Sequence, residues 1–124
     1  MNKPLLLAVV EDLYFQSQIE GIAQAKKIDY YFATQGEQLS QLAKTLSPSL
    51  VIVDLSGVET EWIFRHIGNI SNMRPELPIV GLVSHVQQTV RERAERYGCK
   101  FVFNKSEFAK KLPETIEKVL RKTI

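Results

Sequence analysis

Three acidic side chains and one lysine stand directly after apolar segments of the chain, where they could act together. Glu11 and Asp12 follow one apolar segment, Asp54 ends another, and Lys105 comes just after a third. If these segments are strands of one parallel sheet, their ends share one crevice. Crowded carboxylates raise one another's pKa unless a cation neutralises them. Mg²⁺ is the expected cation, because it binds one or two carboxylates together with waters and phosphate oxygens. Lys105 could pair with Asp54 or hold an anion beside it.

The segment that ends at Asp54 indicates the kind of sheet. Residues Ser49 to Asp54 form a short, unbroken apolar run that does not alternate between polar and apolar positions. Such a run is typical of a central strand buried on both faces, as in a parallel sheet covered by helices. Asp54 would then stand at the carboxyl edge, where open α/β sheets bind their ligands.

The remainder of the chain alternates strand and helix patterns. Further strands are predicted at Pro4–Val10, Ile28–Ala33, Pro78–Val83 and Phe101–Phe103. Apolar positions at helical spacing occur over Phe15–Ala23, Leu39–Leu46, Trp62–Ile70, Val86–Tyr97 and, in the last helix, Ile116–Leu120. Gly98 is well placed to end the fourth helix. Alternation of this kind predicts an α/β fold, a doubly wound three-layer αβα sandwich with right-handed crossovers.

The start of the last helix is the least obvious boundary. Proline is tolerated in the first turn of a helix far better than in its interior. We therefore expect this helix to begin at Pro113, with Ser106 to Leu112 forming an extra turn or a short separate helix.

Composition limits the functions that the chain can have. Its 124 residues suit one domain, residues 1–124, with no repeat or linker. Lys plus Arg number 16 and Asp plus Glu number 14, and no basic patch accompanies them, so direct nucleic-acid binding is not expected.

The lone Cys99 excludes an internal disulfide and is expected in the core. His66 and His85 lack a third ligand for a transition metal. Without a signal peptide or a long apolar span, the chain is expected to be soluble and cytoplasmic, with no membrane contact.

Four motifs in one order carry a family resemblance. They are Val9-Val10-Glu11-Asp12, Leu50–Asp54, Pro78–Leu82, and Gly98-Cys99 leading to Lys105. Together they resemble the CheY-like receiver domain of bacterial two-component response regulators, over nearly the whole chain. The resemblance implies a flavodoxin-like, five-stranded parallel sheet in the order 2-1-3-4-5, for which a member of this family serves as a standard example.

The resemblance also implies a function for each polar residue. Asp54 would accept a phosphoryl group from a histidine kinase or phosphotransfer protein, and Lys105 would contact that group. Glu11, Asp12 and Asp54 would hold Mg²⁺ with the backbone carbonyl of Ser56. The domain would not itself be an enzyme. It would alter a face that binds a downstream protein or a fused output domain, and the face formed by the fourth helix, fifth strand and fifth helix could pair two copies as a homodimer.

The chain departs from the family pattern at the positions that relay phosphorylation. Val83 stands where receivers have a hydroxyl at the end of the fourth strand, although Ser84 follows one place later. Val102 replaces the switch aromatic, and Ser106 replaces the proline after the lysine. The loop after Asp54, Leu55 to Glu59, lacks the usual Met-Pro and Asp-Gly pairs. Acceptor chemistry is therefore expected to be intact and the relay altered.

Plainer structural roles remain open for the same residues. Asp12 could cap the first helix, Asp54 could form a turn at its strand end, Lys105 could be a solvated lysine, and Ser84 could be a loop or capping residue. The functional alternative is a pseudo-receiver that binds a protein partner without phosphate. A third alternative, an aspartyl-phosphate hydrolase or a flavin-binding protein on the same fold, lacks support. The chain has no Gly-rich phosphate loop and no acid two places after Asp54.

Overall fold

A parallel sheet of five strands forms the centre of the molecule, in the order β2-β1-β3-β4-β5. The computed structural model describes residues 4–34, 39–56, 60–84 and 88–121. The strands are β1 (Leu5–Val9), β2 (Asp29–Phe32), β3 (Leu50–Asp54), β4 (Ile79–Val83) and β5 (Phe101–Asn104). The helices are α1 (Leu13–Ala25), α2 (Leu39–Leu46), α3 (Thr60–Met73), α4 (Gln88–Tyr97), the 3₁₀ turn η1 (Lys105–Glu107) and α5 (Phe108–Arg121). The predicted α/β fold and strand order are confirmed.

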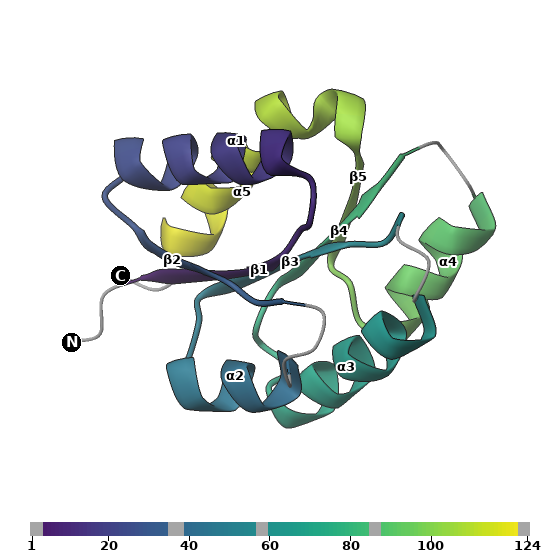
Figure 1. The fold of residues 1–124 in the computed structure, drawn as a ribbon. Helices are drawn as coiled ribbons and strands as arrows, with labels where there is room; N and C mark the ends of the chain where they lie inside the picture. The colour runs from purple at the N-terminus through teal and green to yellow at the C-terminus, as the bar shows by residue number, and fades with distance from the viewer. Residues whose placement is uncertain (1–3, 35–38, 57–59, 85–87, 122–124) are drawn as a thin grey trace.

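The helices form a layer on each face of the sheet (Figure 1): α1 and α5 cover one face, and α2, α3 and α4 cover the other. The central strand β3 contributes to both cores. Val51 and Val53 pack in the core on the side of α2, α3 and α4. Leu50 and Ile52 pack in the core on the side of α1 and α5. All four side chains are buried, which explains why the run before Asp54 is apolar without alternation.

The register of the strands brings the predicted site residues to one edge. Val9 of β1 pairs with Val53 of β3, and Asp54 pairs with Leu82 of β4. On the far side of β4, Val83 pairs with Asn104 of β5. The residues that follow β1, β3 and β5 therefore emerge at the same end of the sheet, as parallel strands require.

The last helix begins earlier than predicted. The helix α5 starts at Phe108, and Pro113 lies inside it. The apolar stripe explains the difference, because Phe108, Leu112 and Ile116 are each almost fully buried, with at most 1% of their surface exposed. Burying such side chains contributes about 1.5–3 kcal/mol each, which together exceeds the cost of about 3 kcal/mol for an interior proline. The prediction that the helix begins at Pro113 was therefore wrong.

A buried histidine joins α2 to α3. The backbone N–H of Ser40, in the first turn of α2, donates to Nδ1 of His66 on α3 at 3.0 Å, and the Ser40 hydroxyl lies 2.6 Å from the same nitrogen. The ring of Trp62 packs against His66. Burial lowers the pKa of His66, with a smaller contribution from the charge of Arg65. The neutral ring thus satisfies a helix N–H that would otherwise lack a partner.

Other predicted features are confirmed where the structure describes them. The helix α4 ends at Tyr97, and Gly98 follows it with a φ of +130° that favours glycine. Cys99 is buried in the core, and burial raises the pKa of its thiol to about 12. His85, Val86, the loop residues Gly57–Glu59 and the Leu120 side chain lie outside the described residues. Within the described ranges, no helix is long and apolar enough to cross a membrane.

Replacing Pro113 by alanine should raise the free energy of unfolding by about 1–3 kcal/mol, because a restored N–H can complete the helical hydrogen bonding and the ring no longer crowds the preceding turn. The measurement is equilibrium unfolding in urea. Pro75→Ala is the matched control. Pro75 lies in the turn after α3, so its loss should lower stability by about 0.4–1 kcal/mol through the unfolded chain. Equal destabilisation by both substitutions would contradict this account of α5.

Candidate functional site

Asp54 lies at the carboxyl edge of the sheet and forms an ion pair with Lys105. The Lys105 Nζ is 2.9 Å from Oδ2 of Asp54. Only 18% of the Lys105 side chain and 14% of the Asp54 side chain are exposed. Asp54 is the last residue of β3, and Lys105 is the first residue of η1 after β5. The two residues are brought together across β4, which lies between these strands. The prediction that Lys105 could pair with Asp54 is confirmed.

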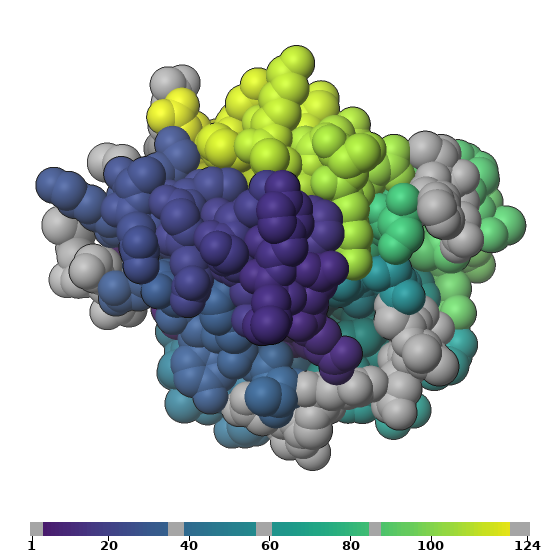
Figure 2. Space-filling view, turned by 45° about the horizontal axis from the view of Figure 1, so that its top comes forward, coloured from purple at the N-terminus to yellow at the C-terminus, as the bar shows by residue number. Residues whose placement is uncertain are grey.

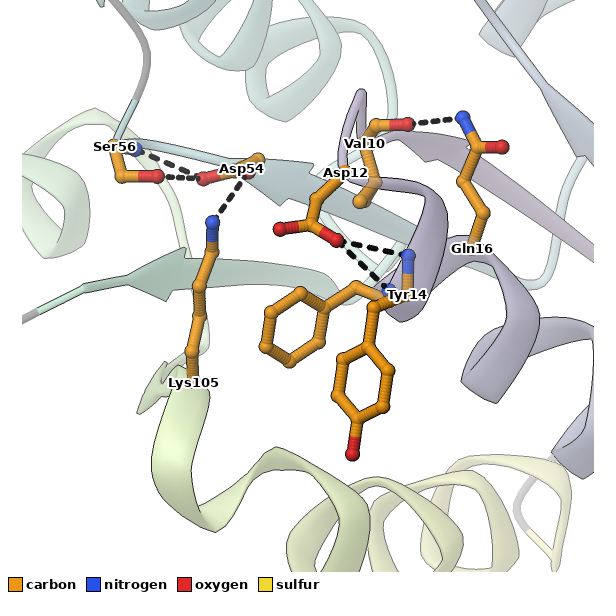
Figure 3. Close-up of polar contacts among 8 residues, drawn as sticks. Val10, Asp12, Tyr14, Gln16, Asp54, Ser56 and Lys105 are labelled. Carbon is orange, nitrogen blue, oxygen red and sulfur yellow. Dashed lines mark hydrogen bonds and ion pairs between the residues drawn. The ribbon is translucent and has the colours of Figure 1, made fainter.

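The other oxygen of the Asp54 carboxylate is bound by Ser56. The backbone N–H of Ser56 donates to Oδ1 at 2.9 Å, and the Ser56 hydroxyl donates to the same atom. A carboxylate that accepts from the N–H two residues later forms a turn with its own side chain. Asp54 therefore also forms a turn at the end of its strand, a role that the sequence had left open. Both of its carboxylate oxygens have partners within the chain (Figure 3).

An aromatic ring confines the lysine. The Lys105 ammonium lies 5.1 Å from the centre of the Phe15 ring, within the range of a cation–π contact. Phe15 lies in the first turn of α1, and its ring packs edge-on against the buried Phe108 of α5. The start of α1 and the end of β3 thus both contact the ammonium, and Phe108 of α5 packs against the ring that it faces.

Asp12 caps the first helix at the border of this site. Its Oδ1 accepts from the backbone N–H groups of Tyr14 at 2.8 Å and Phe15 at 3.4 Å. The backbone before the helix is fixed by Gln16, whose Nε2 donates to the Val10 carbonyl at 2.6 Å. Asp12 Oδ2 accepts no hydrogen bond from the described residues, and it is turned toward the side where Asp54 and Lys105 lie (Figure 3). The capping role is thus real and leaves one oxygen available.

The metal expectation can be tested against this donor set. Glu11 and Asp12 are exposed, and the described residues contain no group of three His, Cys, Asp or Glu side chains placed to hold a metal ion. The expected Mg²⁺ site of Glu11, Asp12 and Asp54 therefore stays a prediction. Mg²⁺ needs only one or two carboxylates, with waters completing its octahedron. Asp12 Oδ2, Asp54 and the Ser56 carbonyl are oxygen donors of that kind, so these residues fit Mg²⁺ better than a transition metal.

The relay positions lie where the sequence placed them. Val83 ends β4 and Val102 lies in β5, and both side chains are buried. Ser84 is exposed, and in the described part of the chain no hydrogen bond joins it to Asp54. From α4, Arg91 Nη1 donates to the Val102 carbonyl at 2.9 Å. The hydroxyl that contacts Asp54 comes from the loop after β3 and not from the end of β4.

Sequence reasoning missed three contributors to this edge of the sheet. Phe15 was counted only as a core position, although its place within one turn of Asp12 could have indicated proximity to the site. Ser56 was expected to contribute its carbonyl and not its hydroxyl. Arg91 was not singled out, because no local pattern marks its contact with β5.

Segments that are far apart in the sequence meet at the edge of the sheet that carries the site. In Figure 2 the purple start of α1 and the yellow-green segment after β5 meet the teal and green ends of β3 and β4 on one face. On α1, beside Asp12, Leu13 and Tyr14 expose 78% and 65% of their surface. These two residues form an exposed apolar border beside Asp12.

Comparisons with known proteins agree on the fold. The CheY-like protein TadZ from Pseudomonas aeruginosa PAO1 matches with a TM-score of 0.81 at 14% identity, over 94% of this chain and 98% of that chain. The signal receiver domain of the DNA-binding response regulator MerR from Colwellia psychrerythraea 34H matches with a TM-score of 0.81 at 16% identity, over 95% and 98%. The signal receiver domain of a modulated diguanylate cyclase from Desulfovibrio desulfuricans G20 matches with a TM-score of 0.76 at 20% identity, over 98% and 96%.

Comparisons of the sequence alone found no matching family or protein. No model of a protein family matches the chain, and no curated protein matches it. The TM-scores of 0.76–0.81 establish a shared fold, whereas identities of only 14–20% leave the chemistry to be argued from the residues. The chain has the fold of CheY-like receiver domains of response regulators over nearly its whole length.

The cap at Asp12 can be separated from any other role of this residue. Asp12→Ala should lower the free energy of unfolding by about 1 kcal/mol, because two backbone N–H groups lose their acceptor. Asp12→Asn should change it by only a few tenths of a kcal/mol, since asparagine caps about as well as aspartate. Urea unfolding without divalent ions measures both variants. Equal losses would mean that the charge of Asp12, and not its cap, stabilises α1.

Proposed function

We propose that this chain is a receiver domain that accepts a phosphoryl group on Asp54 from a histidine kinase or phosphotransfer protein. One observation carries the proposal: the Asp54 carboxylate stands at the carboxyl edge of the sheet with the Lys105 ammonium 2.9 Å from Oδ2. A carboxylate can act as a nucleophile toward phosphorus. A fixed cation beside it can neutralise the charge on transferring phosphoryl oxygens.

Lys105 has a geometric reason to act in this way. Its ammonium is a compact charge with three donors, and one donor directed to Asp54 leaves others for an anion that arrives at Oδ2. The Phe15 ring and the limited exposure of the side chain keep the ammonium in place. Less reorganisation is then needed when the phosphoryl group arrives, which is how preorganised charges assist a reaction.

Mg²⁺ is the cofactor that we propose for this step. Asp12 Oδ2, Asp54 and the Ser56 carbonyl would hold it, with Glu11 as a further acidic ligand. When bound, the ion would supply positive charge to the phosphoryl oxygens and orient the donor. Asp54 would remain the nucleophile and Lys105 the fixed cation of the protein itself.

The proposed output is binding, not turnover of a substrate. Phosphorylation of Asp54 would alter the face formed by α4, β5 and α5, on which a downstream protein, a fused output domain or a second copy of the chain would dock. Two of the similar structures are named as receiver domains of larger regulators, one DNA-binding and one a diguanylate cyclase, which supports an output of this kind. We propose further that the domain acts in the cytoplasm, where such kinases deliver phosphoryl groups, and that it contacts neither nucleic acid nor membrane directly.

A pseudo-receiver is the second candidate. Both oxygens of Asp54 already have partners within the chain. Val83 and Val102 are buried side chains without a hydroxyl or a ring, and Arg91 ties α4 to the β5 backbone. These observations favour a module that keeps one conformation and binds its partner without phosphate.

Phosphorylation distinguishes the two candidates. With Mg²⁺ and acetyl phosphate, or a phosphorylated histidine kinase, intact-mass measurement should detect one phosphoryl group on the wild-type chain and none on Asp54→Asn. Asp12→Asn keeps the helix cap and should be phosphorylated more slowly, because one proposed Mg²⁺ ligand loses its charge. Lys105→Met should also slow the reaction while leaving the fold intact.

Two outcomes of the phosphorylation experiment would contradict the proposal. No mass gain on a folded wild-type chain at a high concentration of donor, with a known receiver domain modified in the same tube, would refute the phosphoryl acceptor and leave the pseudo-receiver. Modification that persists in Asp54→Asn would place the acceptor elsewhere.

The relay should be weak even where Asp54 is phosphorylated. Val83 cannot donate to a phosphoryl oxygen and Val102 has no ring to move. The hydrogen bond of about 1.5–3 kcal/mol that a hydroxyl could make to such a charged acceptor is therefore missing. Beryllofluoride, a mimic of the phosphoryl group, should shift amide signals around Asp54 strongly and those around Val90 and Val102 little, in wild type and in Ser84→Ala. Large shifts at Val90 and Val102 that survive Ser84→Ala would contradict this expectation.

A further inference from the structure

We infer that two arginines of α4, Arg91 and Arg93, clamp this helix between β5 and α3, so that α4 does not move within the proposed face of α4, β5 and α5. The inference rests on the proposed function for the meaning of that face, and it goes beyond it by stating which part of the face stays fixed. The clamp itself does not require that Asp54 is phosphorylated, so it can be tested separately.

The two arginines lie on opposite flanks of α4. Ala94 is buried in the core under the helix, and Val90 packs against the same core. Residues two positions apart in a helix do not face the same side, so the side chains of Arg91 and Arg93 extend in different directions. Arg91 reaches β5, and Arg93 reaches α3. The helix is therefore held on both sides of its buried stripe.

On the first flank, Arg91 binds the backbone of β5. Its Nη1 donates to the Val102 carbonyl at 2.9 Å, in a partly buried position. Hydrogen bonds with a charged donor are roughly twice as strong as those between neutral groups. A carbonyl in a strand cannot turn away as a side chain can, because the sheet fixes its direction. The contact therefore ties α4 to the sheet itself.

On the second flank, Arg93 lies over α3. Its guanidinium group is 4.4 Å from the centre of the Phe64 ring, and its Nη2 donates to the Glu61 carboxylate. Phe64 is almost fully buried, whereas the Glu61 side chain is exposed. An exposed ion pair contributes little to stability, and a cation over an aromatic ring contributes more where water is excluded. The Phe64 ring is thus the main contact of Arg93.

The carboxyl end of α4 also packs closely on α3. The Tyr97 ring packs against Phe64, and a Cβ atom at Gly68 would lie 3.4 Å from the Tyr97 ring. A Cβ atom at Gly98 would overlap the Ser71 side chain. Because close-packed surfaces do not deform gradually, α4 cannot slide along α3 without breaking these contacts. The clamp thus acts on a helix that is already seated against its neighbour.

The clamp adds to the effect of the replaced relay positions. A signal that travelled from Asp54 through Val83 could move α4 only after the contacts of Arg91 and Arg93 had broken. The solvent-facing surface of α4 is therefore the same in both states of Asp54. A partner that docks on α4 would not distinguish these states.

Hydrogen exchange of backbone amides tests the clamp, because it measures the local opening of single elements. Exchange is followed by NMR in wild type and in the double variant Arg91→Ala/Arg93→Ala. Arginine and alanine are both good helix formers, so the substitutions do not weaken α4 itself. The α4 amides should exchange about tenfold faster in the double variant, which corresponds to about 1.4 kcal/mol in the opening equilibrium. Arg96→Ala, at an exposed position of the same helix, is the matched control and should leave their exchange unchanged.

Equal exchange of the α4 amides in wild type and the double variant would overturn the clamp. Acceleration that is as large in α1, on the opposite face of the sheet (Figure 1), would also overturn it, because the arginines would then stabilise the whole fold and not α4. Mg²⁺ with beryllofluoride should leave α4 exchange in wild type unchanged, and faster exchange would show that α4 is not fixed. If this mimic shifts no amide signal around Asp54, the proposed acceptor fails, while the comparison of wild type with the double variant still decides the clamp.

Discussion

The ion pair between Asp54 and Lys105 depends on the strand order of the sheet. The two residues follow β3 and β5, which lie on either side of β4, and the register ends these strands at the same edge. The side chains can then meet across the end of β4 at 2.9 Å, mostly shielded from solvent. A different strand order would separate Asp54 from Lys105, and a slip of one residue would turn the Asp54 side chain to the other face of the sheet. The strand order and register therefore determine both the fold and the position of the Asp54–Lys105 pair.

The acids at this edge serve the structure as well as any reaction. Asp12 caps α1 with one oxygen and keeps the other available, and Asp54 forms a turn with Ser56 while it pairs with Lys105. Loss of either residue is thus expected to have a structural effect in addition to a chemical one. Substitutions that keep the hydrogen bond and remove the charge, such as aspartate to asparagine, separate the two. The residues Phe15 and Ser56 add rigidity around the pair, and neither is charged.

The sequence predicted most of the fold because the apolar patterns are strong and local. The run Leu50–Val53 is typical of a strand buried on both faces, and Gly98 was expected to end α4, where the structure has a φ of +130°. The start of α5 was mispredicted because local proline preference was weighed without the burial of Phe108. Asp54 and Lys105 were found because both close strands. The contacts of His66 with Ser40, of Phe15 with Lys105 and of Ser56 with Asp54 arise from tertiary placement, which no local pattern encodes.

The central claim is that Asp54 and Lys105 form one coupled unit, and a double-mutant cycle on the free energy of unfolding tests it most directly. Asp54→Asn keeps the hydrogen bonds to Ser56, and Lys105→Met keeps most of the packing against Phe15, so the cycle isolates the charge interaction. The account predicts a coupling free energy of about 1 kcal/mol or more in low salt, at the upper end of what exposed ion pairs show. Additive effects of the two substitutions, with no coupling beyond error, would mean that the pair does not hold this edge together and would contradict the account.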